Sequence, residues 1–68
     1  MKVKYFKDTD TAHLEFSAAA AVETREISEN VYLDLDAEGN LVSMTIEHAA
    51  TAANLPVLTL EEIETSAA

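Results

Sequence analysis

The clearest alternation of apolar and polar positions runs from Val31 to Glu47. Apolar and polar side chains alternate over residues 31–35 and again over 42–47, the period-2 pattern of a strand with one buried face. The intervening DAEGN contains Gly39, which can adopt the positive φ of a tight turn, and Asn40, which tolerates one. This segment therefore predicts a β-hairpin.

A second hairpin is predicted at the start of the chain. Val3 and Tyr5 alternate with lysines, and Ala12, Leu14 and Phe16 alternate with polar residues. The KDTDT between the two runs is rich in residues that hydrogen-bond their own backbone and favour turns.

The region between the two hairpins predicts a connector and one short strand. The alanines 18–21 favour helix, but four residues are too few to offset the cost of helix nucleation. Residues 24–27 predict a strand, and the nearby Glu23, Arg25 and Glu26 indicate an exposed or edge position.

The strand pattern ends after the Val31–Glu47 hairpin, and two short helical segments are expected. Residues 48–54 predict one or two helical turns, which Pro56 would end. Residues 59–62, TLEE, read as a capping box that begins a second helix, with Leu60 and Ile63 on one face.

These elements predict a single domain over residues 1–68 in the α+β class, mainly antiparallel β. We expect a meander of four to five strands, containing the two hairpins, followed by short C-terminal helical segments. Residues 50–68 would then be a helical tail or lid. The apolar positions predict a core formed by Val3, Tyr5, Leu14, Phe16, Val31, Leu33, Leu35, Val42, Met44 and Ile46.

Two stretches, YFKDTDTAHLEFS and VETREISENVYLDLDAEGNLVSMTIEHA, resemble a small prokaryotic family known as domain of unknown function 2283. The resemblance covers about residues 2–49 and leaves 50–68 outside. It implies the predicted fold and no particular activity. The segments that carry it are Tyr5 to Phe16, Glu23 to Ile27, Val31 to Asp36, Gly39-Asn40 and Leu41 to Glu47.

The charge of the chain excludes several partners. Lysine and arginine total 4 and aspartate and glutamate total 13, which gives a net charge of −9. This is the wrong sign for a phosphate backbone or an anionic membrane, so neither nucleic acid nor a membrane is expected as a partner. The start of the chain has no apolar signal segment, and residues 48–60 are too short and polar to span a bilayer, so a cytoplasmic location is expected. Without cysteine, thiol chemistry and disulfides are excluded.

The segment DLDAEGNLVSMT invites comparison with a calcium loop. Asp34, Asp36 and Glu38 occupy the first three ligand positions, and Gly39 stands where such loops require glycine. The decisive bidentate glutamate is replaced by Thr45, and strands rather than helices flank the loop. An acidic hairpin turn is the favoured interpretation.

Other chemistry-bearing residues form no recognised motif. His13 with Glu15, and His48 beside Glu47, could in principle serve a divalent metal, but no spacing brings the two histidines together. Asp8 and Asp10 are better interpreted as turn formers. The sequence thus predicts no catalytic residue, no metal site and no cofactor, and an enzyme is not expected except at a dimer interface.

Phe6 and Tyr32 fall on the opposite parity from the apolar stripe, as does Leu41. Single exposed aromatics are ordinary, but two that lie adjacent would mark an interface patch.

A homodimer is expected, because an apolar sheet face in so small a chain needs more cover than two short helices supply. The expected contact is a hairpin strand or the apolar cluster Leu55, Val57, Leu58, Leu60 and Ile63. The favoured function is a small acidic self-associating protein-interaction domain. The alternatives are an acidic partner that neutralises a basic protein such as a toxin, and a metal-dependent or dimer-interface enzyme.

Overall fold

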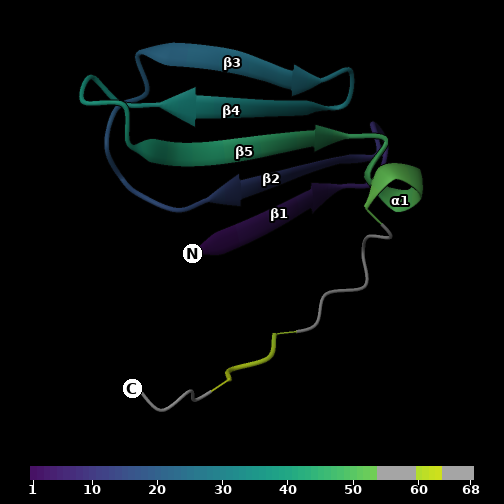
Figure 1. The fold of residues 1–68 in the computed structure, drawn as a ribbon. Helices are drawn as coiled ribbons and strands as arrows, with labels where there is room; N and C mark the ends of the chain where they lie inside the picture. The colour runs from purple at the N-terminus through teal and green to yellow at the C-terminus, as the bar shows by residue number, and fades with distance from the viewer. Residues whose placement is uncertain (54–59, 64–68) are drawn as a thin grey trace.

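Five strands form one antiparallel sheet in the computed structural model, which describes residues 1–53 and 60–63 (Figure 1). Within these described residues, one short helix follows the last strand. The elements are β1 Lys2–Phe6, β2 Thr11–Glu15, β3 Glu23–Ser28, β4 Val31–Leu35, β5 Leu41–Glu47 and α1 Ala49–Ala52. Both predicted hairpins are confirmed, as is the short strand expected at residues 24–27.

The order of strands across the sheet is β1-β2-β5-β4-β3. Strands β3, β4 and β5 follow one another as neighbours, and the β1–β2 hairpin joins them through β2 against β5. Residues 16–22 therefore carry the chain from β2, the second strand from one edge, to β3 at the opposite edge. This connector is fixed where it passes the strand ends: the amides of Phe16 and Ser17 donate to the Val42 carbonyl, and the Val22 amide donates to the Leu35 carbonyl.

The turn between β4 and β5 is built by Asp36. Its carboxylate accepts hydrogen bonds from the amides of Glu38, at 2.9 Å, and Asn40, at 2.8 Å. Gly39 has a φ of 84°, as predicted for this turn. Nothing lies within 4 Å of the place where a Cβ would stand on Gly39, so glycine is favoured there by its backbone conformation rather than by lack of space.

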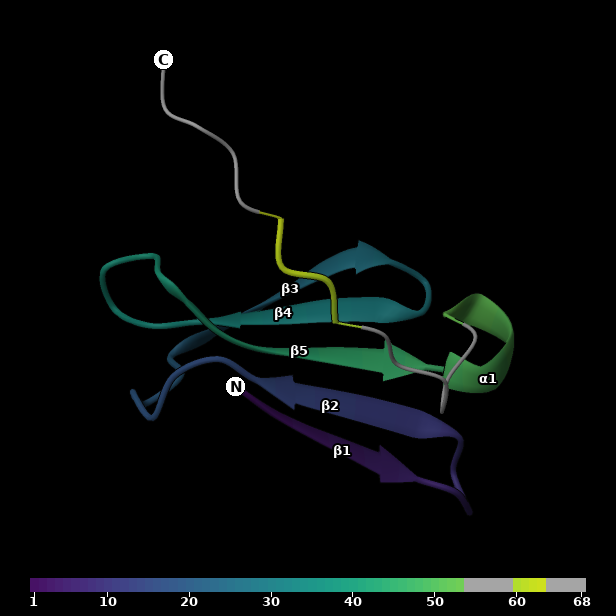
Figure 2. The same ribbon diagram turned by 90° about the horizontal axis from the view of Figure 1, so that it is seen from below.

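Helix α1 lies at the end of the sheet where β1 and β5 finish, beyond the strand ends (Figures 1 and 2). Asp10 holds it there: its backbone carbonyl accepts from the Ala49 amide at 2.9 Å, and its carboxylate accepts from the Ala50 amide at 3.0 Å. The Tyr5 hydroxyl donates to the same carboxylate oxygen at 2.6 Å. One acidic side chain thus joins β1, the first turn and the helix.

The helical turn expected at residues 48–54 is confirmed by α1, but the second helix is not. Leu60–Ile63 have no helical structure and are exposed, while Thr59 lies outside the described residues. A capping box places only the first turn, and without a packed face so short a helix does not offset its nucleation cost. Across residues 1–53 and 60–63, no helix has the length and apolar character to cross a membrane.

Candidate interaction surface

One face of the sheet is apolar across four strands. The register places Val3 opposite Leu14, Leu14 opposite Met44, and Met44 opposite Leu33. Because partners in a register share a face, these side chains form one continuous row. The neighbouring row consists of Tyr5, Ala12, Ile46 and Val31.

This apolar face is only partly covered within the described part of the chain. Among residues 1–53 and 60–63, the buried apolar residues are Ala12, Leu35, Val42 and Ala49, and no large side chain there falls below 2% exposure. Of the predicted core, Leu35 and Val42 are confirmed, each 7% exposed, and they lie where the 16–22 connector is bonded to their strands. The prediction for Phe16 is wrong, because it lies just past the end of β2 and is 38% exposed. The half-buried members are Val3, Tyr5, Leu14, Val31, Leu33, Met44 and Ile46.

The opposite face is polar, and its side chains bond to one another. Lys4 pairs with Glu15 at 2.9 Å, which lowers the pKa of the Glu15 carboxyl. Asp34 accepts hydrogen bonds from the hydroxyls of Thr24, at 2.6 Å, and Ser43, at 2.8 Å. Among the described residues no buried side-chain polar atom lacks a partner. This face therefore suits contact with water, and the apolar face is the candidate interaction surface.

The apolar face has a charged rim on β3. Arg25 lies opposite Leu33 in the register and Glu23 lies opposite Leu35, so both charges border the apolar rows. The two side chains form an ion pair at 2.6 Å. An apolar centre with a polar rim is the arrangement found in protein–protein interfaces. Sequence reasoning placed Glu23 and Arg25 at an edge, but the pattern alone could not show that they border the apolar rows.

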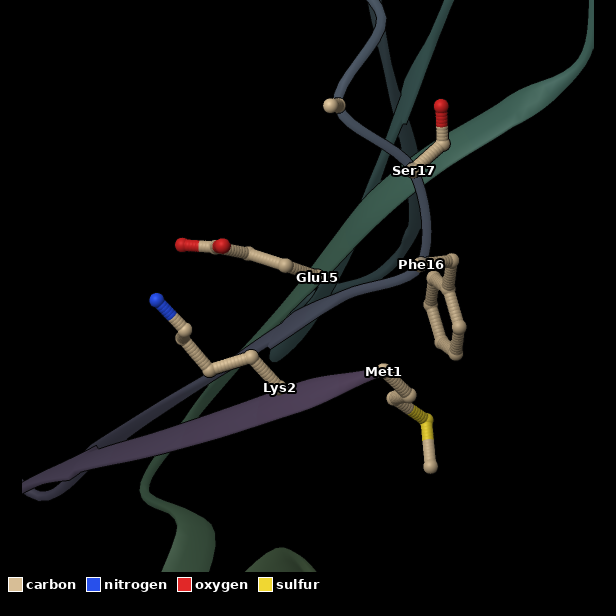
Figure 3. A pocket seen from close by; sticks show the side chains of 6 residues that line it. Met1, Lys2, Glu15, Phe16 and Ser17 are labelled. Atoms are coloured by element: carbon tan, nitrogen blue, oxygen red, sulfur yellow. The ribbon is translucent and has the colours of Figure 1, made fainter.

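A hollow of about 360 Å³ lies where β1 begins and β2 ends (Figure 3). The Lys2 and Glu15 side chains project to one side of it, and Met1 and Phe16 to the other. It therefore straddles the outer edge of the sheet rather than entering a core. Since Lys4 already holds the Glu15 carboxylate, the hollow does not present a free acid–base pair.

The acidic segment of the β4–β5 hairpin does not converge as a calcium loop would require. Asp34 bonds to Thr24 and Ser43 on the polar face, whereas the Asp36 carboxylate is occupied by its own turn. Bonds from the Asn40 amide above all lower the pKa of Asp36. The interpretation as an acidic hairpin turn accounts for these contacts.

The two histidines lie on different elements and bond to different partners. The His13 Nδ1 is 3.2 Å from the Thr45 hydroxyl on the polar face, and the His48 Nδ1 is 3.0 Å from the Asn30 side-chain oxygen. In the described part of the chain, no three histidine or acidic side chains come together as metal ligands. The D-x-D pair also separates, since Asp8 is exposed while Asp10 holds α1.

The remaining interface expectations have mixed outcomes. Phe6 and Tyr32 belong to different rows of the polar face, with β2 and β5 between their strands, so they form no aromatic patch. Leu55, Val57 and Leu58 of the predicted interface cluster lie outside the described residues. The other two members, Leu60 and Ile63, are 80% and 75% exposed.

We predict that Asp34 makes the free energy of unfolding depend on pH in the acidic range. The Thr24 and then the Ser43 hydrogen bonds lower its pKa from 3.8, so the unfolded chain binds this proton more readily than the folded one. The stabilisation is present above the unfolded pKa and is lost as pH falls through the lower folded value. Urea unfolding should show Asp34→Asn less stable than wild type at pH 7, with the gap narrowing as the pH falls below 3.8.

The control is Asp8→Asn, which removes the same negative charge from an exposed position in the first turn and should change the free energy of unfolding little. A gap for Asp34→Asn that stays constant down to pH 2 would contradict the prediction.

Taken together, a single twisted antiparallel sheet with one polar face, one half-covered apolar face and a short helix at its end defines a small mainly-β domain. The chain belongs to the family described as "Protein of unknown function (DUF2283)", whose match covers residues 2–49. The resemblance noted in the sequence is thereby confirmed. Neither the curated proteins nor the solved structures yielded a match.

Proposed function

We propose that this domain is a small acidic protein-interaction module that functions as a homodimer. Its proposed location is the cytoplasm. The observation that supports self-association is the apolar face, where seven large side chains predicted as core remain only half-buried in a single copy. Burial of apolar area is the main favourable term in most protein–protein association. A small domain buries a modest fraction of its surface alone, which favours completing the core by association.

Charge modulates this association. Two copies of a chain with net charge −9 repel each other, and salt screens that repulsion over about 8–10 Å at physiological strength. The dimer is therefore expected to tighten as salt is added, opposite to a contact held by ion pairs.

Sedimentation equilibrium from about 1 to 100 μM, at low and high salt, tests the proposal. We expect a mass twice that of the 7.4 kDa chain at the upper concentrations, with a lower dissociation constant in added salt. A monomer at every concentration, with a cooperative melt that does not depend on concentration, would contradict self-association.

A second candidate function is binding to a basic protein, and it is supported by the acidic end of the β3–β4 hairpin. All six residues of β3 are exposed. Glu47, together with burial and the charges of Glu26 and Glu29, raises the pKa of the Tyr32 phenol, as a concentrated negative field does. Co-purification from native cells, followed by mass spectrometry, would be expected to recover a basic protein. Its loss with Glu26→Lys, but not with Glu38→Gln in the distant turn, would support this role.

A further inference from the structure

The apolar face and the two outer edges are the surfaces through which this sheet could meet a second copy. We propose that the contact is the apolar face, packed against the same face of a second copy as a two-layer sandwich. The proposal rests on the self-association proposed above and names the surface responsible. It differs from the two contacts that the sequence predicts, a hairpin strand or the C-terminal apolar cluster.

The edge formed by β1 is basic. Lys2 and Lys4 lie on this strand and Lys7 follows it, so it holds three of the chain's four lysine and arginine residues. In a symmetric edge-to-edge dimer, β1 would pair with the β1 of the partner and bring these like charges together. Charged edge strands are a known means of preventing such pairing.

The opposite edge, β3, is acidic. Glu23 and Glu26 lie on it and Glu29 follows it, with Arg25 already paired to Glu23. Symmetric pairing of β3 with itself therefore also meets repulsion. Pairing β1 of one copy with β3 of the next would join opposite charges, but this head-to-tail contact leaves one free edge at each end and produces open chains or rings of several copies instead of a two-fold dimer.

The apolar face carries no such obstacle and is large enough. Strands of 5 to 7 residues, about 4.8 Å apart, give each face roughly 24 by 20 Å. Two such faces together present about 960 Å² in projection, and the uneven side-chain surface has more accessible area than its projection. With the charged rim on β3 included, this approaches the lower limit of roughly 1,000 Å² for a biological interface.

The composition of the face also fits contact with itself. Leu14, Met44 and Leu33 occupy three successive positions of one apolar row, where a two-fold contact would bury them completely. The Glu23–Arg25 pair lies at the rim, where charges can stay in water. Leu60 and Ile63, by contrast, are exposed in the structure and do not cover this face.

The test places a charge at the centre of the face. Met44→Glu should weaken dimerisation by more than about a hundredfold, because an unpaired carboxylate would be buried between two apolar surfaces. The matched control is Thr45→Glu, the next residue of β5, which projects from the polar face and should change the dissociation constant by less than about threefold. Circular dichroism checks that each variant is folded.

If Met44→Glu does not fold, a measurement on the wild-type chain tests the proposal in its place. Methyl spectra are recorded while the protein is diluted from dimer to monomer, with sedimentation to follow the mass. The proposal expects the largest shift changes at Leu14, Leu33 and Met44, and small ones at Leu60 and Ile63.

The outcomes separate this surface from the self-association on which it rests. A dimer that survives Met44→Glu but is lost in Leu60→Glu would overturn the face and assign the contact to the C-terminal cluster. An average mass that keeps rising with protein concentration, beyond that of a dimer, would assign the contact to the charged edges. A wild-type monomer at every concentration would overturn both proposals.

Discussion

Replacement of Ala12 by aspartate is expected to abolish cooperative folding. Ala12 is 0% exposed in the interior strand β2, with Tyr5 and Ile46 as its partners in the register. Leaving an unpaired carboxylate in such a site costs about 3–5 kcal/mol, which is comparable to the whole stability of a small domain. Far-ultraviolet circular dichroism and the dispersion of amide resonances at pH 7 would report an unfolded chain.

The control for this substitution is Ala50→Asp. Ala50 lies in α1 and is exposed, so the new carboxylate remains in water and the sheet should persist. If Ala12→Asp melted within a few degrees of wild type, the side chain at position 12 could not be buried as it is in the structure.

The local elements of this fold were predictable from the sequence because each depends on neighbours in the chain. Alternation over residues 31–35 and 42–47 specifies two strands with a shared apolar face, and the Gly39 turn between them fixes which residues meet. The same reasoning held for the first hairpin. The family resemblance added order to these signals, and it matches residues 2–49.

The arrangement of the hairpins was not predictable in the same way. Pairing of β2 with β5 joins residues about 30 positions apart, for example His13 with Thr45, and period-2 alternation is satisfied by many such pairings. The burial of individual side chains was likewise not predictable from the alternation. Leu33 and Leu35 have equivalent places in the pattern, yet only Leu35 is buried, because the connector from β2 to β3 is bonded at its strand end.

Candidate chemistry was hardest to judge from spacing, since a carboxylate's role depends on distant donors. Asp10 was expected to form a turn, and it also accepts the amide of Ala50, 40 positions away. The positive φ of 54° at Asp10 is tolerated by aspartate and gave no signal in the sequence. Asp34 and Asp36 are close in the chain but bond to different parts of the molecule, which separates the apparent calcium ligands.

Shortening Leu35 to alanine is the second substitution with a large expected effect. Leu35 is one of the few large apolar residues that are buried in the described part of the chain, and it lies at the end of β4 near Val42 of β5. Removing a buried leucine side chain costs about 2–5 kcal/mol through lost burial and the cavity left behind. Urea unfolding should show a lower midpoint with a similar slope, because the surface exposed on unfolding hardly changes.

Leu41→Ala provides the matched control, because Leu41 is the register partner of Leu35 but is 38% exposed. The same atoms are removed at a site that water already reaches, so the loss should stay below about 1 kcal/mol. Equal losses at the two positions would mean that the connector does not seal this end of the sheet. If the loss of unfolding free energy in Leu35→Ala did not depend on protein concentration, Leu35 would be buried within one copy. Leu33 differs, because a second sheet would remove its remaining exposure.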